Sequence, residues 1–173
     1  MPTIVALVKH VPDTWSTKTL EDDHTLDRTS VDNVIDEVNE YSVEQALRLR
    51  DDNPDAGFKV VALTMGPAQA DEALRKALAM GADDAVLVSD DSLAGADALS
   101  TAWTLNAALN KLDDVQLITA GTEASDASTG LLTGLLAEYR QLPALTALHK
   151  VELADGTVQG LSLIHISEPT RQA

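Results

Sequence analysis

The 173-residue sequence contains no cysteine, few basic residues and no long hydrophobic run. The absence of cysteine excludes disulfides, thiolate catalysis and thiolate-bound metals, and it is compatible with a reducing compartment. Twelve Lys and Arg against 28 Asp and Glu give a formal net charge of −16, so the surface repels nucleic acid and anionic lipid. No stretch reaches the roughly 18 apolar residues that a membrane span needs, and no leader-like segment precedes the first strand. We therefore predict a cytoplasmic protein with no nucleic-acid partner and no membrane insertion.

Several motifs that carry chemistry are also missing. The four histidines lack the spacing of a zinc site, and no serine stands in a GxSxG elbow. Neither a Walker loop nor a GxGxxG fingerprint is present. Acidic pairs such as Asp83 and Asp84 stand at the ends of expected elements, where turns and caps explain them. We therefore predict no metal site and no catalytic residues, and a hydrolase or ligase acting on an adenylate ranks last among the candidate functions.

Residues 60–88 read as a complete strand, helix and strand. The apolar run 60–63 is typical of a strand buried on both faces, and apolar residues at three- and four-residue spacing in 70–78 predict a helix. Similar patterns predict further strands at 4–8, 115–120 and within 145–153, and helices at 34–49, 99–112 and 131–142. Five strands alternating with four helices predict one α/β domain over residues 1–160, with a doubly wound, mainly parallel five-stranded sheet.

A polar segment from residue 12 to about residue 30 interrupts this alternation without helical periodicity. Loops of this length inside a compact domain are usually functional or interaction elements, so we expect a partner surface here. Trp15 lies within the segment, either as an anchor that faces a partner or as a side chain packed onto the core.

The segment 121–130 follows the fourth strand and consists mostly of small or hydroxylated residues. It is expected at the carboxyl edge of the sheet, directly before a helix, where ligands of open α/β sheets bind. Ser128 and Thr129 offer hydroxyl donors, Gly130 permits close approach, and Asp126 can cap the helix or accept from a ribose or adenine group. Since basic residues are few, we expect backbone amides to bind a phosphate here. The alternative is that these residues are ordinary helix N-caps.

Three segments resemble the electron transfer flavoprotein beta-subunit family. They are residues 8–13 (VKHVPD), residues 41–49 (YSVEQALRL) and residues 65–83, which run from MGPAQ to ALAMGAD. The resemblance extends over roughly residues 3–155. It implies an adenine-nucleotide α-hydrolase-like, Rossmann-like three-layer sandwich with strand order 3-2-1-4-5.

The resemblance also implies a site and partners. In the family, the crevice between strands one and four holds AMP, or a second FAD in electron-bifurcating members, whereas the redox FAD lies mainly in the alpha subunit. The beta subunit scaffolds that FAD and helps to pass electrons from acyl-CoA or other dehydrogenases to the respiratory chain. The positions carried over to this chain as cofactor-binding are Leu7, Asp36, Glu37, Val38, Asn39, Met65, Gly121, Thr122, Glu123, Ala124, Ser125, Asp126, Ala127, Ser128, Thr129, Gly130, Leu131 and Leu132.

Some of these positions depart from the family pattern. Asp36 and Glu37 stand where many members carry Asn-Pro, and Thr122 and Glu123 stand where many carry Lys-Gln. Residues 131–133 are Leu-Leu-Thr rather than Gln-Val-Gly. Because an added carboxylate opposes a phosphate, the occupant stays open between AMP, FAD and none. A stand-alone adenine-nucleotide sensor of the universal-stress type is the alternative function.

The C-terminal residues 161–173 have no counterpart in the family pattern and resemble a translated sequencing-adapter scar. We therefore treat 161–173 as a non-native tail and expect the polypeptide to be a fragment of a longer chain. By contrast, residues 151–158 suit a family strand and hairpin.

Overall fold

A computed structural model describes residues 1–162 of the chain. Its centre is a parallel sheet of four strands in the order β5, β4, β1, β6, formed by Asp84–Val88, Lys59–Met65, Thr3–Leu7 and Val115–Thr119. β1 pairs with β4 from Thr3 opposite Lys59 to Leu7 opposite Leu63. The α/β class and the 3-2-1-4 part of the expected strand order are thereby confirmed.

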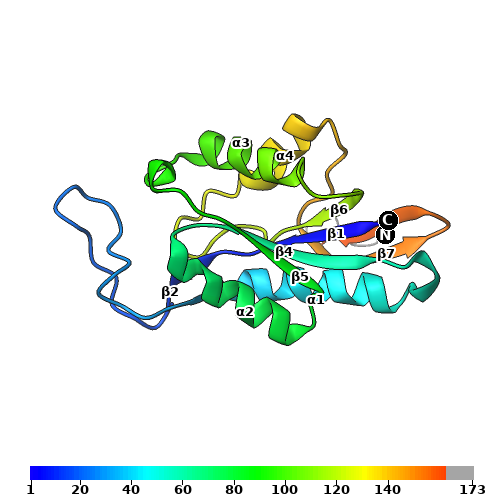
Figure 1. Ribbon diagram of the computed structural model, residues 1–173, viewed down its shortest axis with the longest axis horizontal. Helices are drawn as coiled ribbons and strands as arrows, with labels where there is room; N and C mark the ends of the chain where they lie inside the picture. Colours follow the sequence, from blue (N-terminus) through cyan, green and yellow to red (C-terminus); the bar gives the residue numbers. More distant parts are fainter. Residues whose placement is uncertain (163–173) are drawn as a thin grey trace, which may run out of the picture.

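Helices cover both faces of the sheet and make a three-layer fold (Figure 1). α1 (Glu37–Asp51) and α2 (Asp71–Met80) lie on one face, and α3 (Ala98–Leu109) and α4 (Leu132–Arg140) lie on the other. Successive residues of β1 alternate between two apolar clusters: Ile4 packs with the α1 and α2 side, and Val5 packs with the α3 and α4 side. Each fully buried aliphatic side chain of this kind stabilises the fold by roughly 1.5–3 kcal/mol.

The start of α1 differs from the prediction. Val34 and Ile35 were expected in the helix, but they belong to β3 (Asn33–Ile35), which pairs antiparallel with β2 (His10–Pro12). Asp36 has an extended backbone and its carboxylate accepts from the Val38 N–H, which fixes the helix start one residue later. α1 ends before Asn53 and the 3₁₀ turn Pro54–Ala56, as the proline predicts.

The expected fifth strand does not join the parallel sheet in residues 1–162, so the sheet of this part of the chain has four strands and not the five predicted. β7 (Leu148–Ala154) pairs antiparallel with β8 (Thr157–Ser162), so the hairpin that the resemblance implies for residues 151–158 is present. Asp155 and Gly156 form the two-residue connection, and both have positive φ, at 51° and 72°. An Asp-Gly pair of this geometry favours a tight hairpin, which explains why β7 pairs locally and packs Val151 and Leu153 onto the α1 side.

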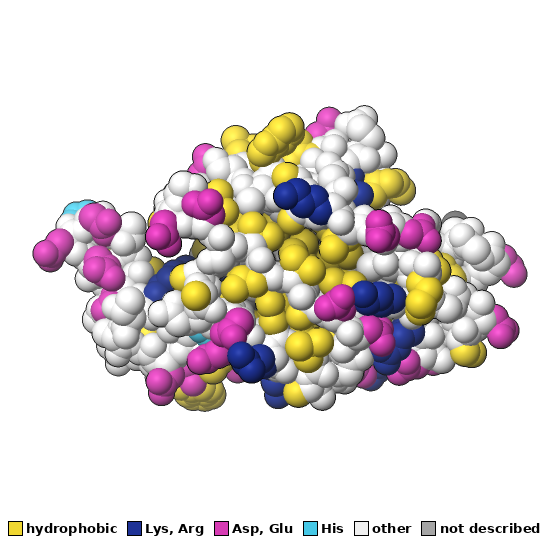
Figure 2. All heavy atoms as spheres, viewed as in Figure 1, with side chains coloured by type: hydrophobic (Ala, Val, Ile, Leu, Met, Phe, Trp, Pro, Cys, Tyr) yellow, Lys and Arg dark blue, Asp and Glu magenta, His cyan; other side chains and the backbone are white. Residues whose placement is uncertain are grey.

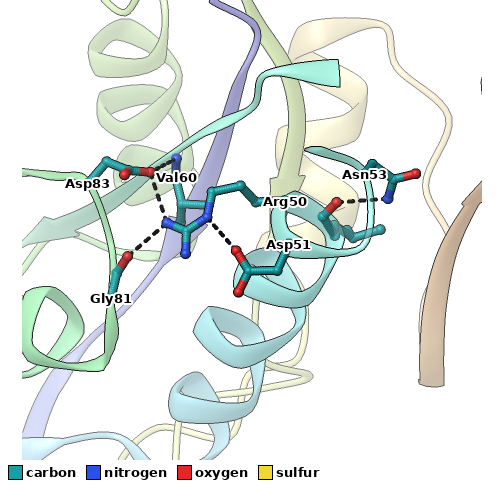
Figure 3. A network of polar contacts seen from close by, with 7 residues as sticks. Arg50, Asp51, Asn53, Val60, Gly81 and Asp83 are labelled. Carbon is teal, nitrogen blue, oxygen red and sulfur yellow. Dashed lines mark hydrogen bonds and ion pairs between the residues drawn. The ribbon is translucent and has the colours of Figure 1, made fainter. Parts of the chain in front are cut away.

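Polar contacts at the amino end of the sheet connect α1 to the β4 and β5 region (Figure 3). The Arg50 guanidinium donates to the Gly81 carbonyl at 2.9 Å, to Asp83 at 3.1 Å and to Asp51 at 2.8 Å. Asp83 also accepts from the Val60 N–H at 2.8 Å. The hydrogen bond with Asp51 and the hydrogen bond and charge of Asp83 raise the pKa of Arg50, so its guanidinium stays charged. It lies at the edge opposite the expected ligand site.

The remaining elements are two short 3₁₀ turns, Ala68–Ala70 and Asp91–Leu93, and the polar segment 13–32 between β2 and β3. As expected, this segment contains no helix. Two sequence predictions stay untested: that residues 161–173 are a non-native tail and that the polypeptide is a fragment of a longer chain. Residues 163–173 lie outside the described residues, and Leu161 and Ser162 are the last residues of β8. Within the described residues, no helix is long and apolar enough to cross a membrane.

Candidate functional site

The carboxyl ends of β1 and β6 meet the first turns of α1. Ser42 of α1 donates its hydroxyl to the Leu7 carbonyl at 3.2 Å, and Thr119 at the end of β6 donates to the Ser42 carbonyl at 3.1 Å. Adjacent parallel strands whose helices depart to opposite faces create a switch point here, which is where ligands of this fold class bind. The first and fourth predicted strands, β1 and β6, are therefore neighbours at this edge, and the start of α1 spans their ends.

Asp36 connects this helix start to the segment 121–131, which we call the site loop. Its carboxylate is fully buried, and it accepts from the Val38 N–H at 3.1 Å and from the Ser125 N–H at 2.7 Å. A buried carboxylate needs such donors because an unsatisfied charge in the interior is costly. Asp36 thus acts as a structural bridge between α1 and the site loop.

The site loop approaches α1 closely at Gly121. A Cβ added there would lie 2.6 Å from Asn39 Nδ2 and 2.9 Å from Val38 Cγ1, so only glycine fits this position. The structure therefore brings together the predicted residues Leu7, Asp36, Val38, Asn39, Gly121 and Ser125 around one turn of helix.

Asp126 has a different role from the one expected. Its side chain is fully buried and forms ion pairs with Lys9, at 2.8 Å, and with Arg28 of the polar segment. Burial raises the pKa of Asp126, but hydrogen bonds and charge from Lys9 and Arg28 outweigh this effect, so the net pKa is lowered. The expectation that Asp126 caps α4 is wrong, because Leu131 is the N-cap residue of this helix and the Asp126 oxygens accept from Lys9 and Arg28. The contact of Asp126 with a ribose or adenine group stays a prediction. Two cationic side chains, Lys9 and Arg28, thus lie beside the site loop, and the binding of a phosphate by backbone amides stays a prediction.

The amino end of α4 lacks a side-chain cap in the described chain. Its N-cap residue is Leu131, and no side-chain hydrogen bond closes the first turn. The explanation of the site-loop residues as ordinary N-caps therefore fails, and the amides at the start of α4 stay available to an anion. Three other loop amides are unavailable: Ser125 donates to Asp36, and Ala127 and Ser128 donate to the Ala124 carbonyl. Within the site loop, the backbone amides that can bind an anion are therefore those at its end, next to the start of α4.

The hydroxyl groups of the site loop differ in their exposure to solvent. Ser128 and Thr129 are exposed next to the start of α4, and Gly130 has open space where a Cβ would stand. The Ser125 hydroxyl is buried and has no hydrogen-bond partner among the described residues. A buried hydroxyl without a partner is uncommon, so this atom is a candidate ligand contact.

The other predicted residues contribute less. Glu37, Thr122, Glu123, Ala127 and Leu131 are exposed, Ala124 is partly exposed, and Leu132 begins α4. Met65 ends β4 at the same edge of the sheet and packs in the apolar cluster that contains Leu7. Two hollows elsewhere, one lined by residues of the segment 13–32 and one by α1 and β7 residues, include none of the predicted site residues.

The resemblance places Leu7 to Lys9 opposite the Gly121 loop, and Lys9 does contact Asp126 of that loop. Sequence reasoning missed Arg28, Ser42 and Thr119. Arg28 gave no signal, because it lies 98 residues from Asp126 in the chain. In residues 1–162, no group of three or more His, Cys, Asp or Glu side chains is arranged to hold a metal ion.

The parallel sheet of four strands with helices on both faces defines the class: a three-layer, doubly wound α/β domain. The sequence model of the electron transfer flavoprotein domain matches residues 23–166. The chain therefore belongs to the electron transfer flavoprotein family.

The relatives that it matches are mostly beta subunits. The chain is 46% identical over 163 residues to the electron transfer flavoprotein subunit beta of Mycobacterium tuberculosis (strain ATCC 25618 / H37Rv), covering 92% of this chain and 61% of the relative. It is 38% identical over 150 residues to the subunit beta of Thermoanaerobacterium thermosaccharolyticum, covering 87% and 56%. It is 37% identical over 152 residues to the caffeyl-CoA reductase-Etf complex subunit CarD of Acetobacterium woodii, covering 88% and 57%. The chain thus spans about three fifths of the length of these relatives.

Proposed function

We propose that this chain works as the beta subunit of a heterodimeric electron transfer flavoprotein. In this proposal it scaffolds a redox FAD held mainly by an alpha subunit, and electrons pass from acyl-CoA or other dehydrogenases to the respiratory chain. Support comes from the family membership and from the relatives, which are named as electron-transfer subunits. No observation favours the stand-alone stress-type sensor.

We further propose that the site loop and the start of α4 hold the phosphate of an adenine nucleotide, either AMP or a second FAD. The single observation that carries this proposal is the helix start without a side-chain cap beside exposed Ser128 and Thr129. The buried Ser125 hydroxyl without a partner supports a ligand that contributes a donor or acceptor. Lys9 and Arg28 offset the charge of Asp126 and so reduce its repulsion of a phosphate.

Calorimetric titration with AMP tests the nucleotide site in two matched variants. Gly130 and Gly57 both have positive φ, 61° and 63°, and neither has an atom within 4 Å of an added Cβ. Gly130→Asp places a negative charge at the start of α4, so AMP affinity should fall more than about tenfold, or about 1.4 kcal/mol. Gly57→Asp carries the same substitution far from the site and should bind AMP like the unmodified protein. Equal affinities in the two variants would place the nucleotide elsewhere.

Co-expression with an electron transfer flavoprotein alpha subunit tests the subunit role. The expected result is a heterodimer that carries flavin absorbance at about one redox FAD per pair. A chain that purifies alone and free of flavin, although the alpha subunit is present and folded, would refute this role.

A further inference from the structure

Residues 13–32 form an arm that projects from the body of the molecule between β2 and β3 (Figure 1). At its base, β2 and β3 pair antiparallel, and the Asp13 N–H donates to the Asp32 carbonyl at 2.9 Å. Farther out, Leu20 pairs antiparallel with Leu26. The arm is therefore a hydrogen-bonded element of the fold that leaves the body and returns to it.

The returning side of the arm holds the site loop at two consecutive residues. Before β3, the Arg28 guanidinium forms an ion pair with the Asp126 carboxylate, and we call this ion pair the latch. Directly after β3, the Asp36 carboxylate accepts from the Ser125 N–H at 2.7 Å. Both carboxylates are fully buried, so loss of either contact leaves a costly unsatisfied charge. The base of the arm and the site loop therefore cannot move independently while these contacts are intact.

The latch is the single polar attachment of the arm beyond its base. Within residues 1–162, no other hydrogen bond or ion pair joins residues 13–32 to a residue outside β2 and β3. Figure 2 shows carboxylates gathered on the projecting part of the molecule, and residues 13–32 carry six acidic side chains against Lys18 and Arg28. Because the whole chain has a net charge of −16, repulsion between like charges opposes contact of the arm with the body. The latch supplies an attraction that offsets this repulsion.

The cations around Asp126 leave an excess of positive charge beside the site loop. Lys9 and Arg28 each carry one positive charge and share a single carboxylate. Their side chains are 37% and 40% exposed, so both can face a ligand as well as Asp126. Among residues 1–162, Asp126 is the only acceptor for either side chain, and both cationic groups have further N–H donors. An anion beside the site loop therefore meets unused donors and a local charge opposite to that of the chain as a whole.

We propose that Arg28 couples the arm to the nucleotide site: a phosphate at the start of α4 strengthens the latch, and the closed latch strengthens binding of the phosphate. Ser128 follows Asp126 by two residues, so their Cα atoms lie at most about 7 Å apart. Since the screening length is about 8 Å at physiological ionic strength, a phosphate beside Ser128 still attracts Arg28 when the latch is closed. A coupling between two binding events is reciprocal, so each event favours the other. This inference rests on the proposed nucleotide site.

Calorimetric titration with AMP at low and at high salt tests the effect of the latch on the nucleotide. Arg28→Gln removes the charge and should raise the Kd for AMP about fivefold or more at low salt, with a smaller effect at high salt. Arg28→Lys keeps the charge and should restore most of the affinity, which a loss caused only by altered packing would not allow. Arg48→Gln is the matched control, because it neutralises an exposed arginine paired with Glu44 about three turns along α1, and it should bind AMP like the unmodified chain.

Limited digestion with trypsin tests the reverse effect, that of the nucleotide on the arm, and it needs no variant. Lys18 is exposed within the arm, and a protease cleaves such a segment when it opens locally. Saturating AMP should slow cleavage after Lys18 in the unmodified chain about threefold or more. Cleavage after the exposed Lys111, between α3 and β6, is the internal control and should keep its rate. In Arg28→Gln, saturating AMP should no longer protect Lys18.

The outcomes separate this inference from the proposed site. If Arg28→Gln binds AMP as tightly as the unmodified chain at low salt, or if bound AMP leaves cleavage after Lys18 unchanged, the coupling is refuted while the nucleotide site stands. If Arg28→Lys loses as much affinity as Arg28→Gln, the role of the Arg28 charge is refuted. If AMP does not bind the unmodified chain at all, the proposed nucleotide site has failed, and the coupling fails with it.

Discussion

The ion pairs of Asp126 offer the sharpest test of how the site is held together. The substitution Asp126→Asn keeps the shape of the side chain but removes its charge. In the structure this carboxylate is fully buried and accepts from Lys9 and Arg28, which come from the end of β1 and from the arm. The variant therefore loses the contact that fastens the arm to the site loop.

The expected loss of stability lies between two limits. Breaking a buried ion pair costs roughly 3–5 kcal/mol because a charge stays behind without a partner. Here the cations left behind are 37% and 40% exposed and can be rehydrated, which brings the cost towards the roughly 0–1 kcal/mol of an exposed pair. We expect the free energy of unfolding to fall by about 1–3 kcal/mol at neutral pH.

The pKa of Asp126 determines how the difference in stability between the two proteins changes with pH. The pKa of Asp126 in the folded protein lies below its ordinary value of 3.8. Its contribution to stability is therefore complete above 3.8 and is lost as the pH falls through the folded pKa. The difference between the unmodified protein and Asp126→Asn should be largest near neutral pH and should shrink below pH 3.8.

Urea unfolding followed by far-ultraviolet circular dichroism, at neutral and at acidic pH, measures this difference. Glu44→Gln is the matched control, because it neutralises an exposed carboxylate paired with Arg48 at 2.8 Å and should cost less than about 0.5 kcal/mol. The reasoning fails if Asp126→Asn costs no more than Glu44→Gln at neutral pH. It also fails if the difference persists unchanged in acid.

Three further predictions concern the core and the two ends of the sheet. Gly121→Ala should destabilise the protein by about 1–3 kcal/mol, because its Cβ would overlap Asn39; thermal unfolding that matches the unmodified protein would contradict this. Arg50→Ala should cost about 1–2 kcal/mol in urea unfolding through the loss of its bonds to Gly81 and Asp83, and a change in AMP affinity would speak against its purely structural role. Leu63→Ala should cost about 2–5 kcal/mol because this side chain is fully buried, whereas Leu78→Ala on exposed α2 surface should cost far less; similar midpoints for the two would refute the assignment of the core.

The local parts of the fold could be predicted from the sequence because short-range patterns encode them. The apolar run at 60–63, the helical spacing at 70–78 and the second run at 86–88 predict β4, α2 and β5, which the structure confirms. The prediction fails where two local signals compete. Val34 and Ile35 fit a helical stripe, but pairing with β2 and the cap at Asp36 place them in β3. The Asp155-Gly156 turn likewise directs β7 into a hairpin instead of the central sheet.

The candidate site could be predicted only in part. The small-residue loop lies at the carboxyl edge of the sheet after β6, as predicted, because ligand-facing loops of this fold class follow the strands at that edge. The strand order that places β6 beside β1 came from the family resemblance. The hydrogen-bond partners within the site could not be predicted from the sequence. Asp36 and Ser125 are 89 residues apart in the chain, and Asp126 and Arg28 are 98 residues apart.

The sequence by itself determined the acidic composition, the alternation of β1, β4, β5 and β6 with the four helices, and the family motifs, since composition and residue spacing are properties of the chain alone. Only the tertiary structure decided that two cations neutralise Asp126, that α4 starts without a side-chain cap, and that Trp15 stands in solvent on a projecting arm. These features depend on which residues, distant in the sequence, lie within a few ångströms of one another in the folded chain. Hydrogen bonds and ion pairs depend on that distance in space and not on separation in the sequence.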